Sequence, residues 1–488
     1  MEPSAGEGVI TAKPKPYRNV CEVIVANDFC VGCGVCAGVC PARALTMQFN
    51  AHGEYIARET GTACLEKCDL CFRACPFWNQ ADNEDTLAQA AFGSVPNIHH
   101  RPETGYYLDA FVGYSNVDGH RANGASGGLA TWFLETLLRQ GIVDRVVCVV
   151  ANDDPSKLFK FAVLDQVEGV RRASRSCYYP VELSGVIHEI LTTEARYAII
   201  GLPCFLKGLR LAMRMNRRLR ERVTVLAGLV CGQTQSKQLA EYLCALGGGN
   251  PAHMARAVFR VKDPARPATD HGFRFECQSG PVSSGTVFWS EGMSEAWTTG
   301  YFRPGACDFC DDVFAEVADV VFMDAWLPEY RREHKGTNLV LVRSGAVQQV
   351  LESAALIGTV DLARTDVERV IASQRGVIFK KRTELACGAR RIRNANPASA
   401  YLPRKRVEPQ LRVGRMDWLL LSLKERIRAK GLEAFNMGSA ASSPERVQGA
   451  TRRLRLLVAC AGTASRVFRK ARTTALRFRP RTGAADVR

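Results

Sequence analysis

The stretch that decides the fold of the amino-terminal region is FCVGCGVCAGVCPARAL, residues 29–45. Four cysteines stand here at the spacing C-x2-C-x2-C-x3-C, and Pro41 follows directly after the last one. Glycine-bearing turns let three such thiolates converge on one 4Fe-4S cluster, and in two-cluster ferredoxins the fourth cysteine binds the other cluster. The run, which consists of Cys30, Cys33, Cys36 and Cys40, therefore predicts a second run further along the chain.

A second run is present and ends on Pro76. It has the spacing C-x3-C-x2-C-x3-C-P, with one residue more in the first gap than the first run, and consists of Cys64, Cys68, Cys71 and Cys75. Two such runs predict a ferredoxin-like domain with two 4Fe-4S clusters over residues 20–80. The alternative is a pair of zinc sites, but these usually join two C-x2-C knuckles across a longer gap. Compact runs that each end in Cys-Pro favour clusters.

The composition of the whole chain is that of a globular protein, with 488 residues, 47% hydrophobic and 23% charged. This length predicts two or three domains. The amino-terminal residues have no apolar core of the kind that a signal peptide needs, and no uncharged apolar run is long enough to span a bilayer. We therefore expect a cytoplasmic protein, in which the 19 cysteines stay reduced and bind metal or take part in redox chemistry.

The net charge of +16 is concentrated at the carboxyl end of the chain. From Tyr401 to Arg488, Lys and Arg outnumber Asp and Glu by 21 to 6, which leaves the rest close to neutral. Residues 415–435 are predicted to form a basic amphipathic helix with Leu420, Leu423 and Ile427 on one side. This basic helical or disordered tail could dock to a membrane surface or to an acidic protein such as ferredoxin, or could simply be solvated. Nothing suggests a module that binds nucleic acid.

The middle of the chain alternates between predicted helices and strands. Residues 79–105 are mostly polar and predict a linker, whereas ASGGLATWFLETLLRQG, residues 125–141, predicts a helix with one apolar face. Mostly apolar runs at 142–152, 195–203 and 222–232 predict buried strands. This alternation predicts an α/β (α+β) multidomain protein with a mainly parallel sheet. The Ser-Gly-Gly turn before the helix, Ser126 to Gly128, is suited to an anion or to capping by Ser126.

Five segments of this region carry a resemblance to a known family. They are RANGASGGLAT at 121, AIIGLPCFLKGLR at 198, GLVCG at 228, CDFCDDVFAEVADVVFMDAW at 307 and KGTNLVLVRS at 335. Over about residues 20–385 the chain resembles the family of coenzyme F420 hydrogenase/dehydrogenase beta subunits. The resemblance implies regions at 106–195 and 196–385, the second of which binds flavin and a cluster. The basic tail at 401–488 lies outside the resemblance.

The resemblance also implies cofactors and site residues. It implies a bound FAD, with Ser126, Gly127 and Gly128 at its phosphates and Lys335, Thr337 and Asn338 along the flavin. It implies a third 4Fe-4S cluster, for which the candidate ligands each lie in a loop or at the end of a strand, where α/β sheets place their ligands. These ligands are Cys204, Cys231, Cys307 and Cys310. The catalytic residues stay unassigned.

The sequence departs from the family pattern at several points. Cys177 stands in SRSCYY where many members have lysine, and Leu202, Phe205 and Met323 replace smaller or polar residues. These changes make the site less polar and remove a positive charge, so a deazaflavin with an anionic tail would bind less well.

Together, the cysteine runs and the resemblance imply an iron–sulfur flavoprotein that passes electrons between a ferredoxin-like carrier and FAD, with hydride transfer to or from an organic substrate such as coenzyme F420. Two alternatives stay open. One is a ferredoxin-dependent reductase of a biosynthetic intermediate, and the other is an electron-relay protein that works only within a larger complex.

Overall fold

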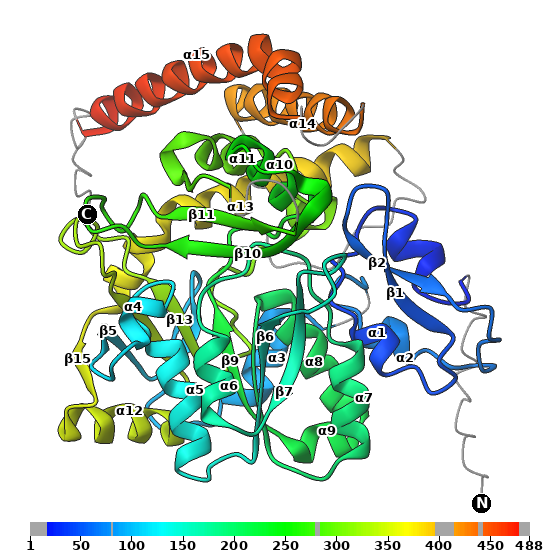
Figure 1. The fold of residues 1–488 in the computed structure, drawn as a ribbon, viewed down its shortest axis with the longest axis vertical. Coiled ribbons are helices and arrows are strands. Elements are labelled where there is room, and N and C mark those ends of the chain that lie inside the picture. The colour runs from blue at the N-terminus through cyan, green and yellow to red at the C-terminus, as the bar shows by residue number, and fades with distance from the viewer. Residues whose placement is uncertain (1–16, 80–81, 279–283, 396–413, 438–442, 478–488) are drawn as a thin grey trace, which may run out of the picture.

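The computed structural model of the chain describes residues 17–79, 82–278, 284–395, 414–437 and 443–477. The amino-terminal region, at the right of Figure 1, is a small α+β unit built around the two cysteine runs. Its elements are η1 Cys21–Val25, α1 Val35–Gly38, β1 Leu45–Phe49, β2 Tyr55–Glu59 and α2 Leu70–Arg73. β1 and β2 form an antiparallel hairpin.

This unit is not separated from the rest of the chain by a free linker. α1 packs on α7 Ser184–Thr192 and on α8 Pro203–Met215, and α2 also packs on α8. The contact is close, because a Cβ at Gly38 of α1 would lie 2.7 Å from the Ile187 side chain of α7. The Leu183 amide donates a hydrogen bond to the Cys33 carbonyl at 3.0 Å. One hydrophobic core therefore runs from the ferredoxin-like unit into the body.

The predicted linker contains a helix and a hairpin. These are α3 Glu84–Phe92, β3 His99–Arg101 and β4 Gly105–Tyr107. Asn83 caps α3 by accepting a hydrogen bond from the Thr86 amide at 3.0 Å, and Leu87 and Phe92 are buried. The linker prediction was wrong because the polar residues of this segment are a helix cap and a solvated helix face.

The body contains an eight-stranded mixed sheet in the order β15-β5-β14-β13-β9-β8-β6-β7. Strands β6, β8, β9 and β13 run parallel, and the remaining strands join the edges in antiparallel fashion. The three apolar runs predicted as buried strands are β6, β8 and β9, so the α/β class is confirmed, although the sheet is mixed rather than mainly parallel. Its strands are β5 Asp109–Ser115, β6 Arg145–Ala151, β7 Phe159–Leu164, β8 Tyr197–Gly201, β9 Val223–Leu229, β13 Val320–Asp324, β14 Asn338–Val342 and β15 Val360–Arg364.

Helices cover the sheet on both sides (Figure 1). The helix predicted after the Ser-Gly-Gly turn is α5, and it buries Leu129, Trp132, Phe133 and Leu137 as expected. The helices of the body are α4 His120–Asn123, α5 Leu129–Arg139, α6 Val167–Arg172, α7 Ser184–Thr192, α8 Pro203–Met215, α9 Arg217–Arg222, α12 Gly345–Ile357 and α13 Val367–Ala395.

A second layer lies above the sheet in the view of Figure 1 and has a core of its own. A three-stranded antiparallel sheet, with the order β10-β11-β12, forms its base. Its elements are α10 Gln238–Leu246, η2 Pro251–His253, β10 Met254–Val261, β11 Gly272–Cys277, β12 Val287–Phe288, η3 Trp289–Glu291, α11 Met293–Thr299 and η4 Gly305–Phe309.

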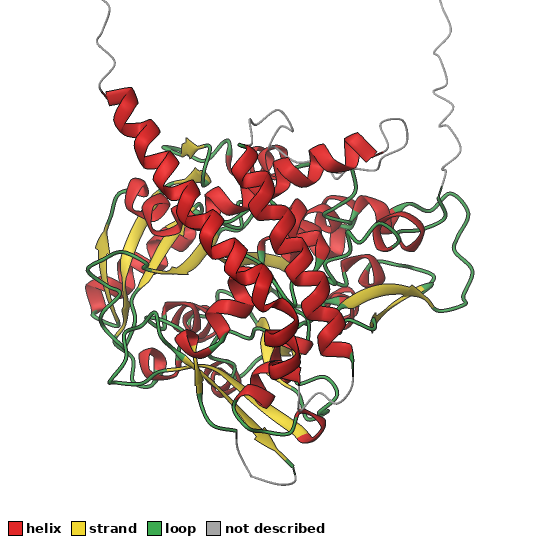
Figure 2. Ribbon diagram, turned by 90° about the horizontal axis from the view of Figure 1, so that it is seen from above, coloured by secondary structure: helices red, strands yellow, loops and turns green. Residues whose placement is uncertain are grey.

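The basic tail contributes α14 Arg415–Asn436 and α15 Ser443–Arg477, which lie across the top of the molecule (Figure 2). Ile427, Phe435 and Val447 enter the core of the second layer, and the Tyr301 hydroxyl lies 3.0 Å from the Thr451 hydroxyl. The tail is therefore packed against the fold through α14 and the amino-terminal part of α15.

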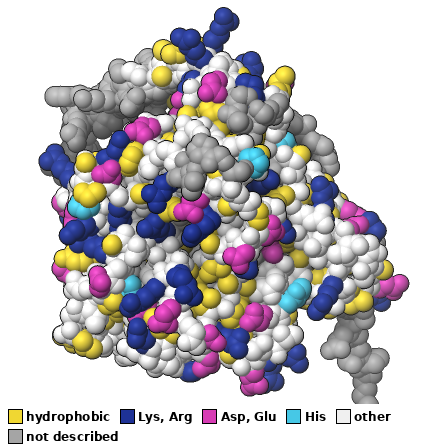
Figure 3. Space-filling view, viewed as in Figure 1, with side chains coloured by type: hydrophobic (Ala, Val, Ile, Leu, Met, Phe, Trp, Pro, Cys, Tyr) yellow, Lys and Arg dark blue, Asp and Glu magenta, His cyan; other side chains and the backbone are white. Residues whose placement is uncertain are grey.

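Basic side chains are not confined to these helices. On the face shown in Figure 3 they lie over the body as well as the top, interspersed with Asp and Glu. Within the described residues, no helix combines the length and hydrophobicity that a bilayer crossing requires.

Candidate functional site

The two amino-terminal cysteine runs exchange their last members. Three cysteines of the first run line one small cavity together with the last cysteine of the second run, and the converse set lines another cavity. The first set is Cys30, Cys33, Cys36 and Cys75, and the second set is Cys40, Cys64, Cys68 and Cys71. This is the crossed arrangement that the spacing predicts for two cubane clusters. Gly32 and Gly34 make the turns between the first thiols with φ of +74° and +77°, a region that favours glycine.

The two sets differ in their exposure to solvent. Cys33, Cys36 and Cys75 are buried, whereas Cys64 is exposed and its three companions are half-buried. Because its thiols are more exposed, the second set is the outer one, and the first set lies between it and the body.

Among the side chains that the structure describes, no three or more His, Cys, Asp or Glu residues lie close enough to hold a single metal ion.

The four cysteines predicted as a third set lie together in the body and are buried, each with 7–8% of its surface exposed. Cys204 is the second residue of α8, Cys231 follows β9, and Cys307 and Cys310 lie at η4. Burial raises the pKa of the Cys204 thiol well above its ordinary value, and the other three thiols of the set raise it further, followed by Cys33 of the inner set. Four mutually close thiols deprotonate together only beside compensating positive charge, which cluster irons supply.

Donors surround the sulfurs of this third set. The Thr234 amide donates to Cys307 Sγ at 3.4 Å, and the Thr234 hydroxyl lies 3.5 Å from the same sulfur. Lys381 of α13 donates from Nζ to Cys310 Sγ at 3.3 Å and to the Asp312 carbonyl at 2.7 Å. Lys381 has only 3% of its surface exposed. Burial lowers the pKa of its ammonium, but the thiols of Cys310, Cys231 and Cys307 outweigh burial and raise it above the ordinary value.

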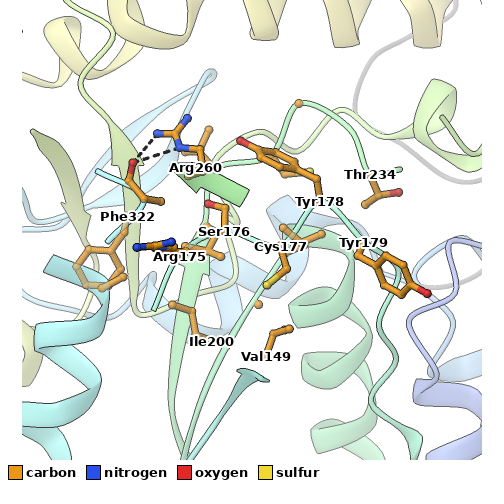
Figure 4. Close-up of a pocket in the computed structure, with 18 of the residues that line it drawn as sticks. Val149, Arg175, Ser176, Cys177, Tyr178, Tyr179, Ile200, Thr234, Arg260 and Phe322 are labelled. Atoms are coloured by element: carbon orange, nitrogen blue, oxygen red, sulfur yellow. Dashed lines mark hydrogen bonds between the residues drawn. The ribbon is translucent and has the colours of Figure 1, made fainter. Parts of the chain in front are cut away.

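A cavity of about 530 Å³ adjoins the third set. It lies between the large sheet and the second layer, and is bounded by Cys231 and Thr234 on one side and by Cys30 of the inner set on another. Its volume is in the range of small-molecule and cofactor sites. Tyr178, Trp289 and Trp297 line it with aromatic surface, and Figure 4 shows the Tyr178 ring at the cavity. Burial raises the pKa of the Tyr178 hydroxyl, so this group stays protonated.

The predicted flavin contacts divide into residues at this cavity and residues behind it. Ser126, Gly128 and Asn338 line the cavity, but Gly127, Lys335 and Thr337 do not. The Lys335 side chain is exposed, and its carbonyl accepts a hydrogen bond from Lys262 Nζ at 2.6 Å. Half of the predicted set therefore faces the cavity.

Several polar groups of the Ser-Gly-Gly turn are engaged within the fold. Ser126 Oγ donates to the Thr337 carbonyl at 2.7 Å, so Ser126 does not cap α5, and Gly128 is the residue before the helix, with φ of +81°. Asn338 Oδ1 accepts from the Leu129 amide at 3.2 Å, while its Nδ2 donates to the Met323 carbonyl at 3.0 Å. The start of α5 and the start of β14 are thus tied together at the wall of the cavity.

Two arginines at the cavity were missed by sequence reasoning. Arg260 of β10 is buried, pairs with Asp324 at 2.6 Å, and donates to the Ala125 carbonyl at 2.8 Å. Arg175 lies in the SRSCYY segment. Both have positive φ, +62° and +93° respectively, which is uncommon for residues other than glycine. Arg175 could have been noticed as the one cation of its segment, whereas nothing in the sequence marks Arg260.

Comparison with protein families finds three matches along the chain. Residues 110–188 match the amino-terminal model of the coenzyme F420 hydrogenase/dehydrogenase beta subunit, and residues 194–368 match its carboxyl-terminal model. Residues 23–46 match the 4Fe-4S binding domain.

Individual relatives are distant. One subunit of the F420H2 dehydrogenase of Methanosarcina mazei is 24% identical over 214 residues, covering 43% of this chain and 54% of the relative. The coenzyme F420-dependent sulfite reductase of Methanocaldococcus jannaschii is 23% identical over 365 residues, covering 74% and 51%. The chain thus spans about half the length of either relative.

Among solved structures, a chain of the F420-reducing NiFe hydrogenase complex of Methanosarcina barkeri aligns with a TM-score of 0.46 and 14% identity, covering 63% of this chain and 98% of that one. The family matches agree with the segments singled out in the sequence. The chain belongs to the family of coenzyme F420 hydrogenase/dehydrogenase beta subunits, which comprises iron–sulfur oxidoreductases and electron-transfer proteins, and it carries a 4Fe-4S binding domain at its amino end.

Proposed function

We propose that this chain relays single electrons between an external ferredoxin-like carrier and an FAD bound in the 530 Å³ cavity, which exchanges hydride with an organic substrate. The observation that carries the proposal is the order of the three cysteine sets. The outer set is nearest to solvent, the inner set lies between it and the body, and the third set borders the cavity. Such an order suits a relay that begins at the surface and ends at a buried reaction site.

The residues present fit these cofactors in several respects. Each cysteine set has the four thiols that a 4Fe-4S cluster requires. At the cavity, Ser126, Gly128 and Asn338 would contact the flavin dinucleotide, and the backbone at Gly124 and Gly128 would lie along its phosphates. FAD supplies the exchange between one-electron and two-electron chemistry. The chain itself would hold the centres in place, exclude water with its aromatic wall, and adjust their potentials through donors such as Lys381 and Thr234.

The substrate is proposed only as a class. The names of both matched relatives refer to coenzyme F420, which supports a deazaflavin. Cys177 and the aromatic side chains at the cavity favour instead a reductase of a less polar biosynthetic intermediate. We further propose a cytoplasmic location and the domain boundaries 20–80, 106–195, 196–385 and 401–488.

Anaerobic purification with quantification of iron, sulfide and flavin tests the proposal. We expect about twelve irons and one FAD for each chain, together with oxidation of reduced ferredoxin or viologen when an acceptor is supplied. Zinc in place of iron would refute the relay. About eight irons would remove the third cluster only.

A second candidate function is that of a relay protein without turnover of its own. The matched Methanosarcina mazei relative is named as a subunit, which supports this candidate. It predicts that the isolated chain holds iron and flavin but turns over only with a co-purified partner. Turnover by the isolated chain with a small acceptor would exclude it.

A further inference from the structure

Arg175 occupies a backbone conformation that its residue type disfavours. It lies between α6 and α7 with φ of +93°, beyond the region that non-glycine residues normally adopt. Strain of this kind persists where the surrounding structure holds it, and it concentrates at binding and catalytic sites. Arg175 also lines the large cavity. The conformation therefore calls for an explanation in terms of what the side chain does there.

The Arg175 guanidinium is held through its Nε, and its two terminal nitrogens form no hydrogen bond among the described residues. Arg175 Nε donates to the Asn123 carbonyl at 3.1 Å, directly before the Gly124–Gly128 turn. Figure 4 shows the guanidinium extending across the pocket, away from Cys177. In the described part of the chain no carboxylate forms an ion pair with it. Arg260 differs, because its guanidinium is already engaged by Asp324 and by the Ala125 carbonyl.

The surroundings of Arg175 favour an anion. Burial and the nearby Arg274 lower the pKa of the Arg175 guanidinium, because no opposite charge compensates it. An unpaired cation that is partly withdrawn from water is costly, and an incoming anion relieves that cost. The planar fork of arginine donors matches phosphate oxygens in a bidentate manner. The backbone of Gly124, Ala125 and Ser126 borders the same end of the cavity.

We propose that Arg175 binds a phosphate or pyrophosphate group at the end of the cavity formed by Gly124, Ala125 and Ser126. The inference deepens the proposed function, on which its choice of ligand rests. The group has two possible sources, namely the pyrophosphate of the flavin dinucleotide and a phosphate carried by the substrate. Arg175 would thus restore, from a different position, the positive charge that Cys177 does not supply.

The test uses the full chain, purified anaerobically, with Arg175→Met and Arg175→Gly as variants. Arg172→Met is the matched control, because Arg172 is exposed on α6 and does not line the cavity. FAD affinity is measured by quenching of flavin fluorescence. Affinity for inorganic pyrophosphate is measured by calorimetry, on the protein as purified and after loading with FAD.

If the flavin supplies the group, both Arg175 variants weaken FAD binding about 10- to 100-fold, the effect of losing a charge-assisted hydrogen bond. If the substrate supplies it, FAD affinity is unchanged and pyrophosphate binding by the loaded protein falls by the same factor. Arg175→Gly should also raise the melting temperature, since glycine accepts this φ. A higher melting temperature would show that the fold is intact, so that weaker binding in this variant reflects the lost contact.

Wild-type affinity for both ligands in Arg175→Gly would overturn the inference. A protein that carries no flavin but binds pyrophosphate through Arg175 would refute the flavin part of the proposed function and leave the inference standing. A protein that binds flavin but in which neither affinity depends on Arg175 would refute the inference and leave the flavin part of the proposed function standing.

Discussion

Replacing Lys381 with methionine should make the reduction potential of the proposed third cluster more negative. Lys381 is buried and its Nζ lies 3.3 Å from Cys310 Sγ, so its charge acts on this set at close range. For an assumed separation of roughly 6 Å between Nζ and the added electron, an effective dielectric constant of about 20 gives an attraction of about 3 kcal/mol. For a one-electron couple, in which about 1.4 kcal/mol equals 59 mV, Lys381→Met should lower the potential by on the order of 100 mV.

The measurement is a redox titration followed by electron paramagnetic resonance, with the third cluster identified as the signal that Cys307→Ser removes. Arg382→Met is the matched control, because Arg382 is the next residue of α13 and donates instead to the Pro102 carbonyl at 2.6 Å. Iron content must equal that of the wild type in both variants. A Lys381→Met shift no larger than that of Arg382→Met, or a shift to a more positive potential, would refute the electrostatic reasoning.

Three further predictions concern the iron content and the fold. Cys307→Ser should lower iron from about twelve to about eight atoms for each chain, whereas Cys244→Ser, which removes a buried thiol outside the three sets, should leave iron analysis unchanged. Lys207→Met should lower the free energy of unfolding by about 3–5 kcal/mol in urea denaturation, because it removes the buried ammonium that pairs with the buried Glu84 carboxylate at 3.3 Å, and adding Glu84→Gln should restore part of the loss. Burial and the adjacent Arg260 hold the pKa of His271 well below its usual value, so the folded state excludes a proton that the unfolded state takes up below pH 6.5. The wild type should then lose up to about 1.4 kcal/mol relative to His271→Gln between pH 6.5 and 5.5, and equal losses in both proteins would contradict this account.

The sequence was sufficient for features whose spacing carries their chemistry. The crossed pairing of the two cysteine runs follows from their spacing, and α5, β6, β8 and β9 follow from apolar periodicity. The sequence was insufficient where polar residues cap a helix or form the solvated face of a helix that packs on the core. The cap at Asn83 was present in the sequence, but its helix lies in a stretch whose composition resembles a linker.

At the candidate site, too, some residues could be predicted from the sequence and others could not. Ser126, Gly128 and Asn338 were found from their segments and face the cavity. The side-chain hydrogen bonds of Ser126 and Asn338 are made within the fold, which no pattern of residues reveals. Arg260 could not be found, and Arg175 is marked only as the one cation of its segment, because the positive-φ conformation of both residues depends on the tertiary structure.

The shared core of the ferredoxin-like unit and the body has a consequence for electron transfer. A module on a flexible tether can swing out, collect an electron and return, so that its rate depends on diffusion of the tethered part. Here the contact of Gly38 with Ile187, and the hydrogen bond from the Leu183 amide to the Cys33 carbonyl, would fix the separations between the proposed centres when the chain folds. Electron transfer between the proposed centres would then take place over fixed distances. Only the docking of the external carrier would depend on viscosity or salt.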